Sequence, residues 1–406
     1  MAAEAPQKAS AAPQGAVMRV VPRIADVAAE AWDACARGEA DATEAGNPFA
    51  SHAFLRALEE SGSASRETGW LPSHILLEDD AGRLAGCMPC YLKSHSRGEY
   101  VFDQGWADAY MRAGGRYYPK LQASVPFTPV TGRRLLVREG ADRGETETLL
   151  LKAGATLAEK LDLSSLHITF VTRDEWQLAG ALGFLQRTDQ QFHWRNEGYE
   201  SFEAFLAALS SRKRKTIRKE RREALTDGIE FEWITGSDLT EAHWDAFFEF
   251  YMDTGARKWG TPYLNRRCFS LLGETMADQV LLVMAKRSGR YIAGALNFIG
   301  PDTLYGRYWG AIEEHPCLHF ETCYYQAIDY AIANHLACVE AGAQGAHKLA
   351  RGYLPVETYS AHYVAAPGLR RAIADFLRRE RRAVAQEIAL LSEESPFRSE
   401  ADDSRS

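Results

Sequence analysis

A short polar segment near the end of the chain holds the side chains best suited to chemistry. Glu340, Gln344, His347, Lys348 and Arg351 lie close together among glycines. Transfer of an acyl group to an amine needs a base for the ammonium proton and a hydrogen-bond donor for the carbonyl oxyanion. Glu340 or His347 could be the base, and Lys348 or Arg351 could stabilise the developing charge. The same pattern also fits a hydrogen-bonded loop clamped around its glycines.

Three elements must position this segment. The sequence predicts an aromatic strand over residues 304–311, a helix over 319–335 with apolar residues at helical spacing, and a short strand over 337–341. A parallel strand–helix–strand unit brings the carboxyl ends of its strands to one edge, where ligands bind. His319 and Glu321 open the helix. They are catalytic candidates, although Glu321 could instead interact only with the helix dipole.

Four more residues near this unit are candidates for substrate binding. Arg307 could pair with Glu340 across the sheet, which is a structural role, or hold a substrate carboxylate. The other candidates are Trp309, Gln344 and Tyr353.

A polar and aromatic stretch in the first half of the chain suits recognition of a sugar or a peptide amine. The alternative is a packed edge strand. Its candidate substrate-binding residues are Asp103, Trp106, Asp108, Tyr110, Tyr118 and Lys120.

A strongly basic run covers residues 212–222. Like charges one helical turn apart destabilise a helix unless anions neutralise them, and Ser210 or Ser211 could cap its start, where backbone N–H groups also favour an anion. The run predicts contacts with a phosphate-rich ligand, such as a nucleotide-diphosphate sugar, an aminoacyl-tRNA or coenzyme A. The alternatives are a solvated linker helix and a nucleic-acid-binding surface. The candidate phosphate-binding residues are Arg212, Arg214, Lys215 and Arg218.

The bulk composition restricts the class of protein. The chain has 406 residues and a formal net charge of −8, so any anion-binding site must be a local patch. No apolar run approaches a membrane span, and the N-terminus does not resemble a secretory signal. Seven scattered cysteines suit a reducing compartment, so we expect a cytoplasmic protein. Cys87 and Cys90 form a C-x-x-C pair with no second pair nearby, so we expect no metal site.

The two halves of the chain echo each other. Each contains a strand, a tight turn and an Ala-Gly strand, and each then has an aromatic segment predicted as a strand, around Gly105-Trp106 and Trp309-Gly310. A repeat near 200 residues indicates two copies of one domain. The predicted parts are a disordered tail (1–18), a first domain (19–195), a linker with the basic helix (196–228), a second domain (229–394) and a polar tail (395–406).

This order of elements resembles tandem acetyltransferase-type (GNAT) domains, and more closely the Fem ligases of peptidoglycan bridge synthesis. The nearest resemblance is to a bacterial family of predicted N-acyltransferases labelled for peptidoglycan biosynthesis or recognition. The sequence motifs that carry this resemblance are NPFASHAFLRALEESGS, YYPKLQASVPFTPVTG, SSRKRKTIRKER, LHFETCYYQAIDYAI and EAGAQGAHKLARGYLP. The resemblance implies an α+β fold of two GNAT-like domains.

The resemblance also implies a function. It is metal-free transfer of an acyl or aminoacyl group, from acyl-CoA or aminoacyl-tRNA, to an amine of an amino acid, peptide, amino sugar or peptidoglycan precursor. A small-molecule or precursor substrate and tRNA are the implied partners. The oligomeric state is left open.

Two departures from the implied pattern support an alternative. A typical acetyltransferase has a glycine-rich pyrophosphate loop after its fourth strand, but residues 312–318 contain two acids and no glycine. In the Fem-type loop at 349–353, Ala350 stands where lysine is expected. The alternative is a non-catalytic protein that uses the same scaffold to recognise an anionic cell-envelope precursor.

Overall fold

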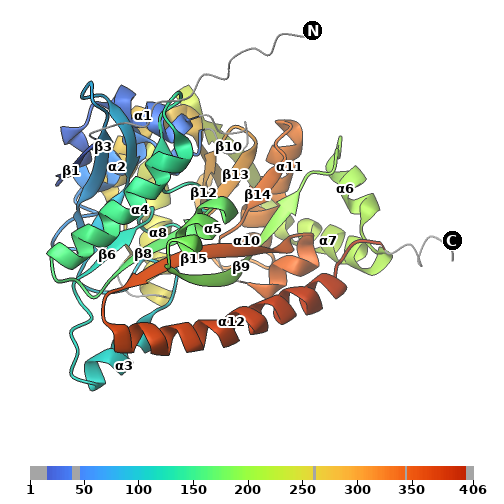
Figure 1. Cartoon of the computed structure of the whole chain (residues 1–406). Coiled ribbons are helices and arrows are strands. Elements are labelled where there is room, and N and C mark those ends of the chain that lie inside the picture. The colour runs from blue at the N-terminus through green and yellow to red at the C-terminus, as the bar shows by residue number, and fades with distance from the viewer. Residues whose placement is uncertain (1–15, 39–45, 259–261, 343–344, 399–406) are drawn as a thin grey trace, which may run out of the picture.

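The computed structural model describes residues 16–38, 46–258, 262–342 and 345–398. Its described strands form an 11-stranded sheet, in the order β10-β11-β12-β13-β14-β9-β15-β8-β6-β5-β2, and a 4-stranded sheet, in the order β1-β3-β4-β7. Helices cover both faces of this assembly (Figure 1). The fold is therefore mixed α/β.

The strands have the following bounds: β1 Val17–Val21, β2 Trp70–Pro72, β3 His74–Glu78, β4 Leu84–Met88, β5 Cys90–Lys93, β6 Lys120–Ala123, β7 Leu136–Val137, β8 Ser165–Val171, β9 Leu185–Arg195, β10 Ile229–Thr235, β11 Val280–Arg287, β12 Arg290–Ile299, β13 Thr303–Ala311, β14 Cys338–Glu340 and β15 Leu354–Val364.

The α-helices have the following bounds: α1 Ala29–Arg37, α2 His52–Glu60, α3 Gln104–Arg112, α4 Arg143–Lys160, α5 Arg173–Ala181, α6 Phe202–Ala208, α7 Ser211–Ala224, α8 Glu241–Lys258, α9 Arg266–Met276, α10 Leu318–Phe320, α11 Gln326–Ala333 and α12 Pro367–Glu393. Short 3-10 turns and a π-helical turn, Glu321–Tyr325, complete the fold.

The two halves of the chain exchange strands. β15 comes from the second half but lies between β8 and β9 of the first half, antiparallel to both. β9 in turn pairs with β14 of the second half. One continuous sheet therefore joins the halves, and residues far apart in the sequence meet along it.

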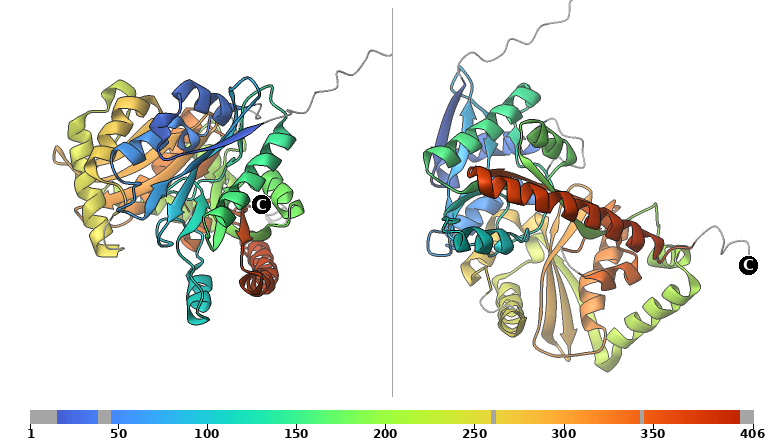
Figure 2. Two further views of the ribbon diagram at one scale, coloured as in Figure 1. Left: turned by 60° about the vertical axis from the view of Figure 1, so that its left-hand side comes forward. Right: turned by 60° about the horizontal axis from the view of Figure 1, so that its bottom comes forward.

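The last helix, α12, also connects the halves. Its first turns pack Leu369 and Ile373 against Trp106 of α3, and its end packs Leu391 into a cluster with Phe205 of α6. Figure 2 shows this helix running along one side of the molecule, from the first half to the second.

The hydrophobic core also joins the two halves. Phe49, in the 3-10 turn before α2, contacts Phe298 on β12 and Tyr305 on β13, with ring centroids 4.8 and 5.3 Å apart. A single large cluster of buried residues includes apolar side chains from α1 and α2 and from α8, α9 and β11. Helices of the first half therefore bury apolar surface against the second half, which fixes the relative position of the two halves.

Several predicted elements are confirmed. β13 is the aromatic strand, β14 is the short strand, and the two are parallel over Thr303–Tyr305 and Cys338–Glu340. The helix predicted over 319–335 is formed by α10, the π-helical turn and α11, and its regular part ends at Ala333. The basic run is helical in α7.

Other sequence predictions are wrong. The stretch around Gly105-Trp106 is helix α3, not a strand that repeats β13. Residues 17 and 18 begin β1 and so do not belong to a tail. Pro396 and Phe397 pack near the start of α7, where Ser210 N donates 3.0 Å to Pro396 O, a contact about which the sequence made no prediction.

Candidate functional site between the halves

Glu340 ends β14, and beyond this point β13 is paired only with β12. The β13–β14 ladder stops at Tyr305 and Glu340, whereas β13 extends to Ala311. Glu340 is only 5% exposed, and Arg307 Nη2 lies 3.1 Å from its Oε2. The structure thus shows the pairing with Glu340, one of the two alternatives for Arg307, and the role of Arg307 in holding a substrate carboxylate stays a prediction.

A loop of the first half closes over this carboxylate. Thr131 Oγ1 donates 2.9 Å to Glu340 Oε1, and Tyr308 Oη on β13 donates 2.7 Å to Phe127 O. Gln191 of β9 anchors the same loop by donating 2.7 Å from Nε2 to Pro129 O. Glu340 is therefore held by groups from both halves.

Two further titratable side chains are buried near Glu340. His193 Nε2 lies 3.8 Å from Glu340 Oε1 and 3.2 Å from Gln191 Oε1. Burial lowers the pKa of His193, with Glu340 acting in the opposite direction. Burial also lowers the pKa of Lys348 to about 7, and Arg307 contributes to this lowering. The charge of Lys348 is therefore finely balanced at neutral pH.

Lys348 is held by the polar loop itself. Its Nζ donates 2.9 Å to Gly342 O, and it is 2% exposed. Glu340, Arg307, His193 and Lys348 combine a carboxylate, a fixed cation, a neutral imidazole and an amine that titrates near pH 7. Such a set can accept a proton and donate hydrogen bonds to an oxyanion.

The strand exchange places a row of polar residues along one face of the large sheet. Gln122 Nε2 donates 3.1 Å to Thr169 Oγ1, and His167 Nδ1 lies 2.7 Å from His362 Nδ1. Beyond these, Ser360 pairs in register with Arg187, Thr358 with Asp189, and Glu340 with His193. Because alternate residues of a strand share a face, the row runs from β6 to β14.

His347 and Arg351 belong to a different group, around α7. Arg351 Nη2 donates 2.8 and 3.0 Å to the carboxylate of Glu220, and its guanidinium lies 3.4 Å from the ring centroid of Phe320. His347 is exposed, and its Nε2 lies 2.9 Å from Tyr324 Oη. The structure therefore divides the polar segment, with Glu340 and Lys348 on one side and these two residues on the other.

The remaining candidates of the second half have defined surroundings. Glu321 is fully buried and accepts 2.9 and 3.1 Å bonds from Arg221. Burial raises the pKa of Glu321, and Arg221 acts in the opposite direction. His319 packs against Trp309 at 5.0 Å, and buried Tyr353 donates 3.3 Å to Tyr324 O. Gln344 lies outside the described residues.

The basic helix divides into paired and unpaired cations. Arg221 pairs with Glu321 and Asp329, and Arg218 pairs with Glu203. In its first turns, Arg212, Arg214 and Lys215 make no ion pair with the described part of the chain, and Arg212 and Lys215 are exposed. Three cations at a helix N-terminus are available for an anion.

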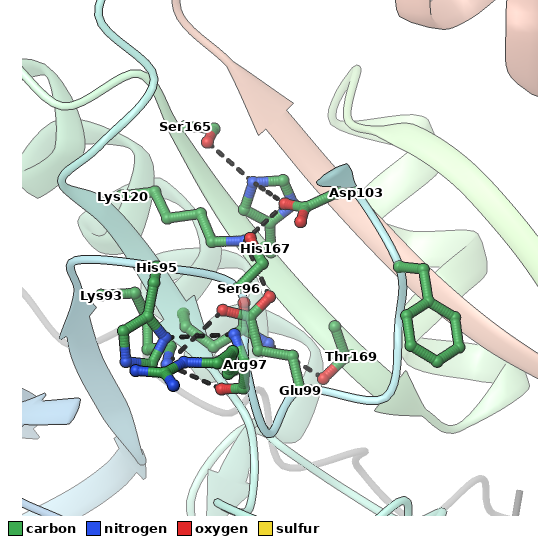
Figure 3. Close-up of polar contacts among 12 residues, drawn as sticks. Lys93, His95, Ser96, Arg97, Glu99, Asp103, Lys120, Ser165, His167 and Thr169 are labelled. Carbon is green, nitrogen blue, oxygen red and sulfur yellow. Dashed lines mark hydrogen bonds and ion pairs between the residues drawn. The ribbon is translucent and has the colours of Figure 1, made fainter. Parts of the chain in front are cut away.

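In the first half, Asp103 and Lys120 are buried against each other (Figure 3). Lys120 Nζ also donates 2.7 Å to Glu99 Oε2 and 2.9 Å to Ser96 Oγ, and Tyr117 Oη donates 2.6 Å to Asp103. Burial alone would raise the pKa of Asp103, but Lys120 lowers it below its usual value. Both side chains are therefore paired with each other inside the protein. Their role in binding substrate stays a prediction.

The other candidates of this stretch are spread around α3. Trp106 is buried against His362, with ring centroids 5.1 Å apart, whereas Asp108 is exposed. Tyr110 packs under Gly115, and Tyr118 Oη lies 2.7 Å from Ser96 Oγ. α3 therefore does not present the six candidates together on one surface.

The sequence-based prediction missed Thr131, Gln191 and His193 as neighbours of Glu340. A usable signal was present only at the end of β9, where Gln191 and His193 alternate with Phe192 and Trp194. Polar residues at every second position of a strand predict a polar face. Their proximity to Glu340 could not be read, because it depends on the strand exchange.

Two mixed α/β halves that share a sheet, with a polar site where they meet, define a tandem acyltransferase-type fold. The model of the FemAB-like family, described as peptidoglycan biosynthesis/recognition, matches residues 23–399. The chain belongs to this family.

Solved structures agree with the fold. FemX has 14% sequence identity, a TM-score of 0.52, and coverage of 86% of this chain and 98% of its own. The C-terminal domain of a proposed lysylphosphatidylglycerol synthetase from Agrobacterium fabrum has 8% identity, a TM-score of 0.51, and coverage of 86% and 95%. No curated protein matches the chain. The predicted Fem-like fold of tandem GNAT domains is confirmed.

No helix in the described part of the chain is long and apolar enough to cross a membrane. Nor do its His, Cys, Asp and Glu side chains form a group of three or more that could hold a metal ion.

Proposed function

We propose that this protein is an N-acyltransferase that moves an acyl or aminoacyl group onto an amine of an amino acid, a peptide or an amino-sugar precursor of the cell wall. The observation that carries the proposal is the setting of Glu340. It lies at the end of the β13–β14 ladder, is buried between the halves, and has Arg307 and Thr131 as direct partners. FemAB-like membership supports a substrate connected with peptidoglycan.

The residues support a direct reaction. The amine nitrogen attacks the carbonyl carbon of the donor, and Glu340 accepts the ammonium proton, assisted by His193. Protonated Lys348 donates a hydrogen bond to the tetrahedral oxyanion. Collapse of the intermediate breaks the bond to the donor oxygen or sulfur, which leaves with a proton, and forms the amide.

The surroundings of residues 312–318 do not suit a CoA pyrophosphate. Glu313 there is 2.7 Å from Arg287 and 2.9 Å from His315, so the loop is already occupied by its own ion pairs. The unpaired cations at the start of α7 suit a phosphate-bearing donor or acceptor better. This contrast disfavours acyl-CoA held by residues 312–318, whereas an aminoacyl-tRNA can bind the cations of α7 and needs no such loop.

The test is turnover by the purified protein with a panel of aminoacyl-tRNAs and a panel of acyl-CoAs, each with amino acids, peptides and UDP-linked muropeptides as acceptors. We expect amide formation that falls at least 100-fold in Glu340→Gln. Glu230→Gln, an exposed acid on β10, is the matched control. Absence of turnover with every donor would overturn the proposal.

A second candidate is a binding protein for an anionic cell-envelope precursor on the same scaffold. The observation that favours it is the acidic, glycine-free segment 312–318, since a transferase that used CoA in the usual way would need glycine there. Tight binding of UDP-linked muropeptides without turnover would support this candidate instead.

A further inference from the structure

A pocket of about 340 Å³ lies between β9, β15, α12 and the loop before α3. Its walls include the aromatic rings of Tyr100, Phe170 and Phe192, and two carboxylates, Asp189 on β9 and Glu387 on α12. The described residues that line it include no lysine or arginine. The pocket is therefore partly apolar and locally acidic.

The two carboxylates are not neutralised by the protein. Neither Asp189 nor Glu387 makes an ion pair with the described part of the chain. The nearest arginine along β9, Arg187, is already bound to Glu380 at 2.7 Å and to Phe102 O at 2.8 Å. Two such acids facing one pocket repel each other, and a bound cation removes this repulsion.

A buried polar group also points to a ligand. Gln190 lines the pocket, and its Oε1 is a buried atom with no hydrogen-bond partner within the ranges that the structure describes. A buried amide oxygen without a partner costs free energy. An ammonium or guanidinium N–H in the pocket would satisfy it.

The pocket adjoins the proposed reaction centre. Gln191 lines the pocket and lies 3.2 Å from His193, which is 3.8 Å from Glu340. Asp189 and His193 are four residues apart on one strand, a span of about 13 Å. A ligand that reaches from the pocket to Glu340 would thus have its cation about that far from its reacting atoms.

We propose that this pocket binds a non-reacting organic cation of the substrate, an ammonium or guanidinium on an apolar stem. The inference rests on the proposed function and narrows the substrate to a peptide or amino-acid derivative with a second positive group. Aromatic rings contact the stem and attract the cation, and Asp189 and Glu387 bind the charge.

The test is calorimetric titration of the full chain with L-lysine amide, L-arginine amide and, as a near-isosteric control without the terminal charge, L-norleucine amide. We expect the two dications to bind at least about tenfold more tightly than norleucine amide, a difference of about 1.4 kcal/mol. The double variant Asp189→Asn/Glu387→Gln should lose this preference. Glu393→Gln, an exposed acid later on α12, should retain it.

The outcomes separate this inference from the proposed function. Binding of the dications in Glu340→Gln, which lacks the proposed base, would support the pocket independently of turnover. Equal binding of norleucine amide, no binding of either dication at millimolar concentration, or a preference that survives in the double variant would each overturn it.

Discussion

The hydroxyl of Thr131 donates a 2.9 Å hydrogen bond to Glu340, although the two residues are 209 positions apart. This bond ties a loop of the first half to the carboxylate that we propose as the base. Thr131→Val keeps the shape of the side chain but removes the donor. We expect turnover to fall by about ten- to a hundredfold and the unfolding free energy to fall by about 1.5 to 3 kcal/mol, because a hydrogen bond to a charged group contributes about that much. Unchanged turnover would show that this bond does not orient Glu340.

Lys348 should make stability depend on pH. Its pKa is about 7 in the fold and 10.5 ordinarily. Between these values the unfolded chain binds the extra proton, so stability rises with pH, and below about pH 7 the full cost of burying the charge is present. We expect Lys348→Met to reduce the rise in unfolding free energy between pH 7 and 9 by about 1 to 3 kcal/mol. Chemical denaturation of both proteins at each pH measures it, and parallel curves would contradict it.

The cations at the start of α7 should bind phosphate. We expect the triple variant Arg212→Ala/Arg214→Ala/Lys215→Ala to weaken binding of a phosphate-bearing donor at least tenfold, and to reduce the slope of log affinity against log salt. Arg222→Ala removes an exposed cation from the far end of the helix and is the matched control. Equal salt slopes for the wild type and the triple variant would reject a phosphate site there.

The histidine pair across β8 and β15 should make the fold sensitive to acid. Burial lowers the pKa of His167 to about 3 and lowers that of His362 well below its usual value. Both are neutral in the fold, so the unfolded chain binds more protons below about pH 6.5, and stability falls as the pH drops. His167→Gln should cost about 1 to 3 kcal/mol at pH 7 and flatten this loss. Thermal melts from pH 7 to 5 test it, and an equally steep loss in the variant would count against it.

The buried ion pair of Asp103 and Lys120 should stabilise the first half. Asp103→Asn removes one of the two carboxylates that hold Lys120 and leaves Glu99 as its partner, so we expect a destabilisation of about 1.5 to 3 kcal/mol. Asp108→Asn, on the exposed side of α3, should change stability by less than about 0.5 kcal/mol. A near-neutral Asp103→Asn that abolishes substrate binding would instead support the sequence-based prediction of a binding role.

Local sequence patterns were sufficient to predict part of the fold and part of the site. The parallel placement of β13 and β14 and the contact between Arg307 and Glu340 both follow from a strand–helix–strand reading of residues 304–341. The helical state of α7 also follows from its local sequence, although which of its cations are paired does not.

The rest of the fold and site could not be predicted, because it depends on pairing between strands that are far apart in the sequence. Nothing in the sequence of residues 354–364 says that β15 leaves its own half and lies between β8 and β9. Nor does the sequence say that β9 pairs with β14, which places His193 opposite Glu340, or that the loop with Thr131 closes over Glu340. The apparent repeat was also misleading at Gly105-Trp106. It predicted a strand there, but the segment is a helix that buries Trp106 against His362.

The most direct test of the account is the rate of amide formation by the wild type and Glu340→Gln under identical conditions, with the donor and acceptor that give the highest wild-type turnover. We predict a loss of at least 100-fold in Glu340→Gln, measured on protein that is shown to be folded and to bind substrate, and wild-type rates in Glu230→Gln. Equal rates for the wild type and Glu340→Gln would contradict it.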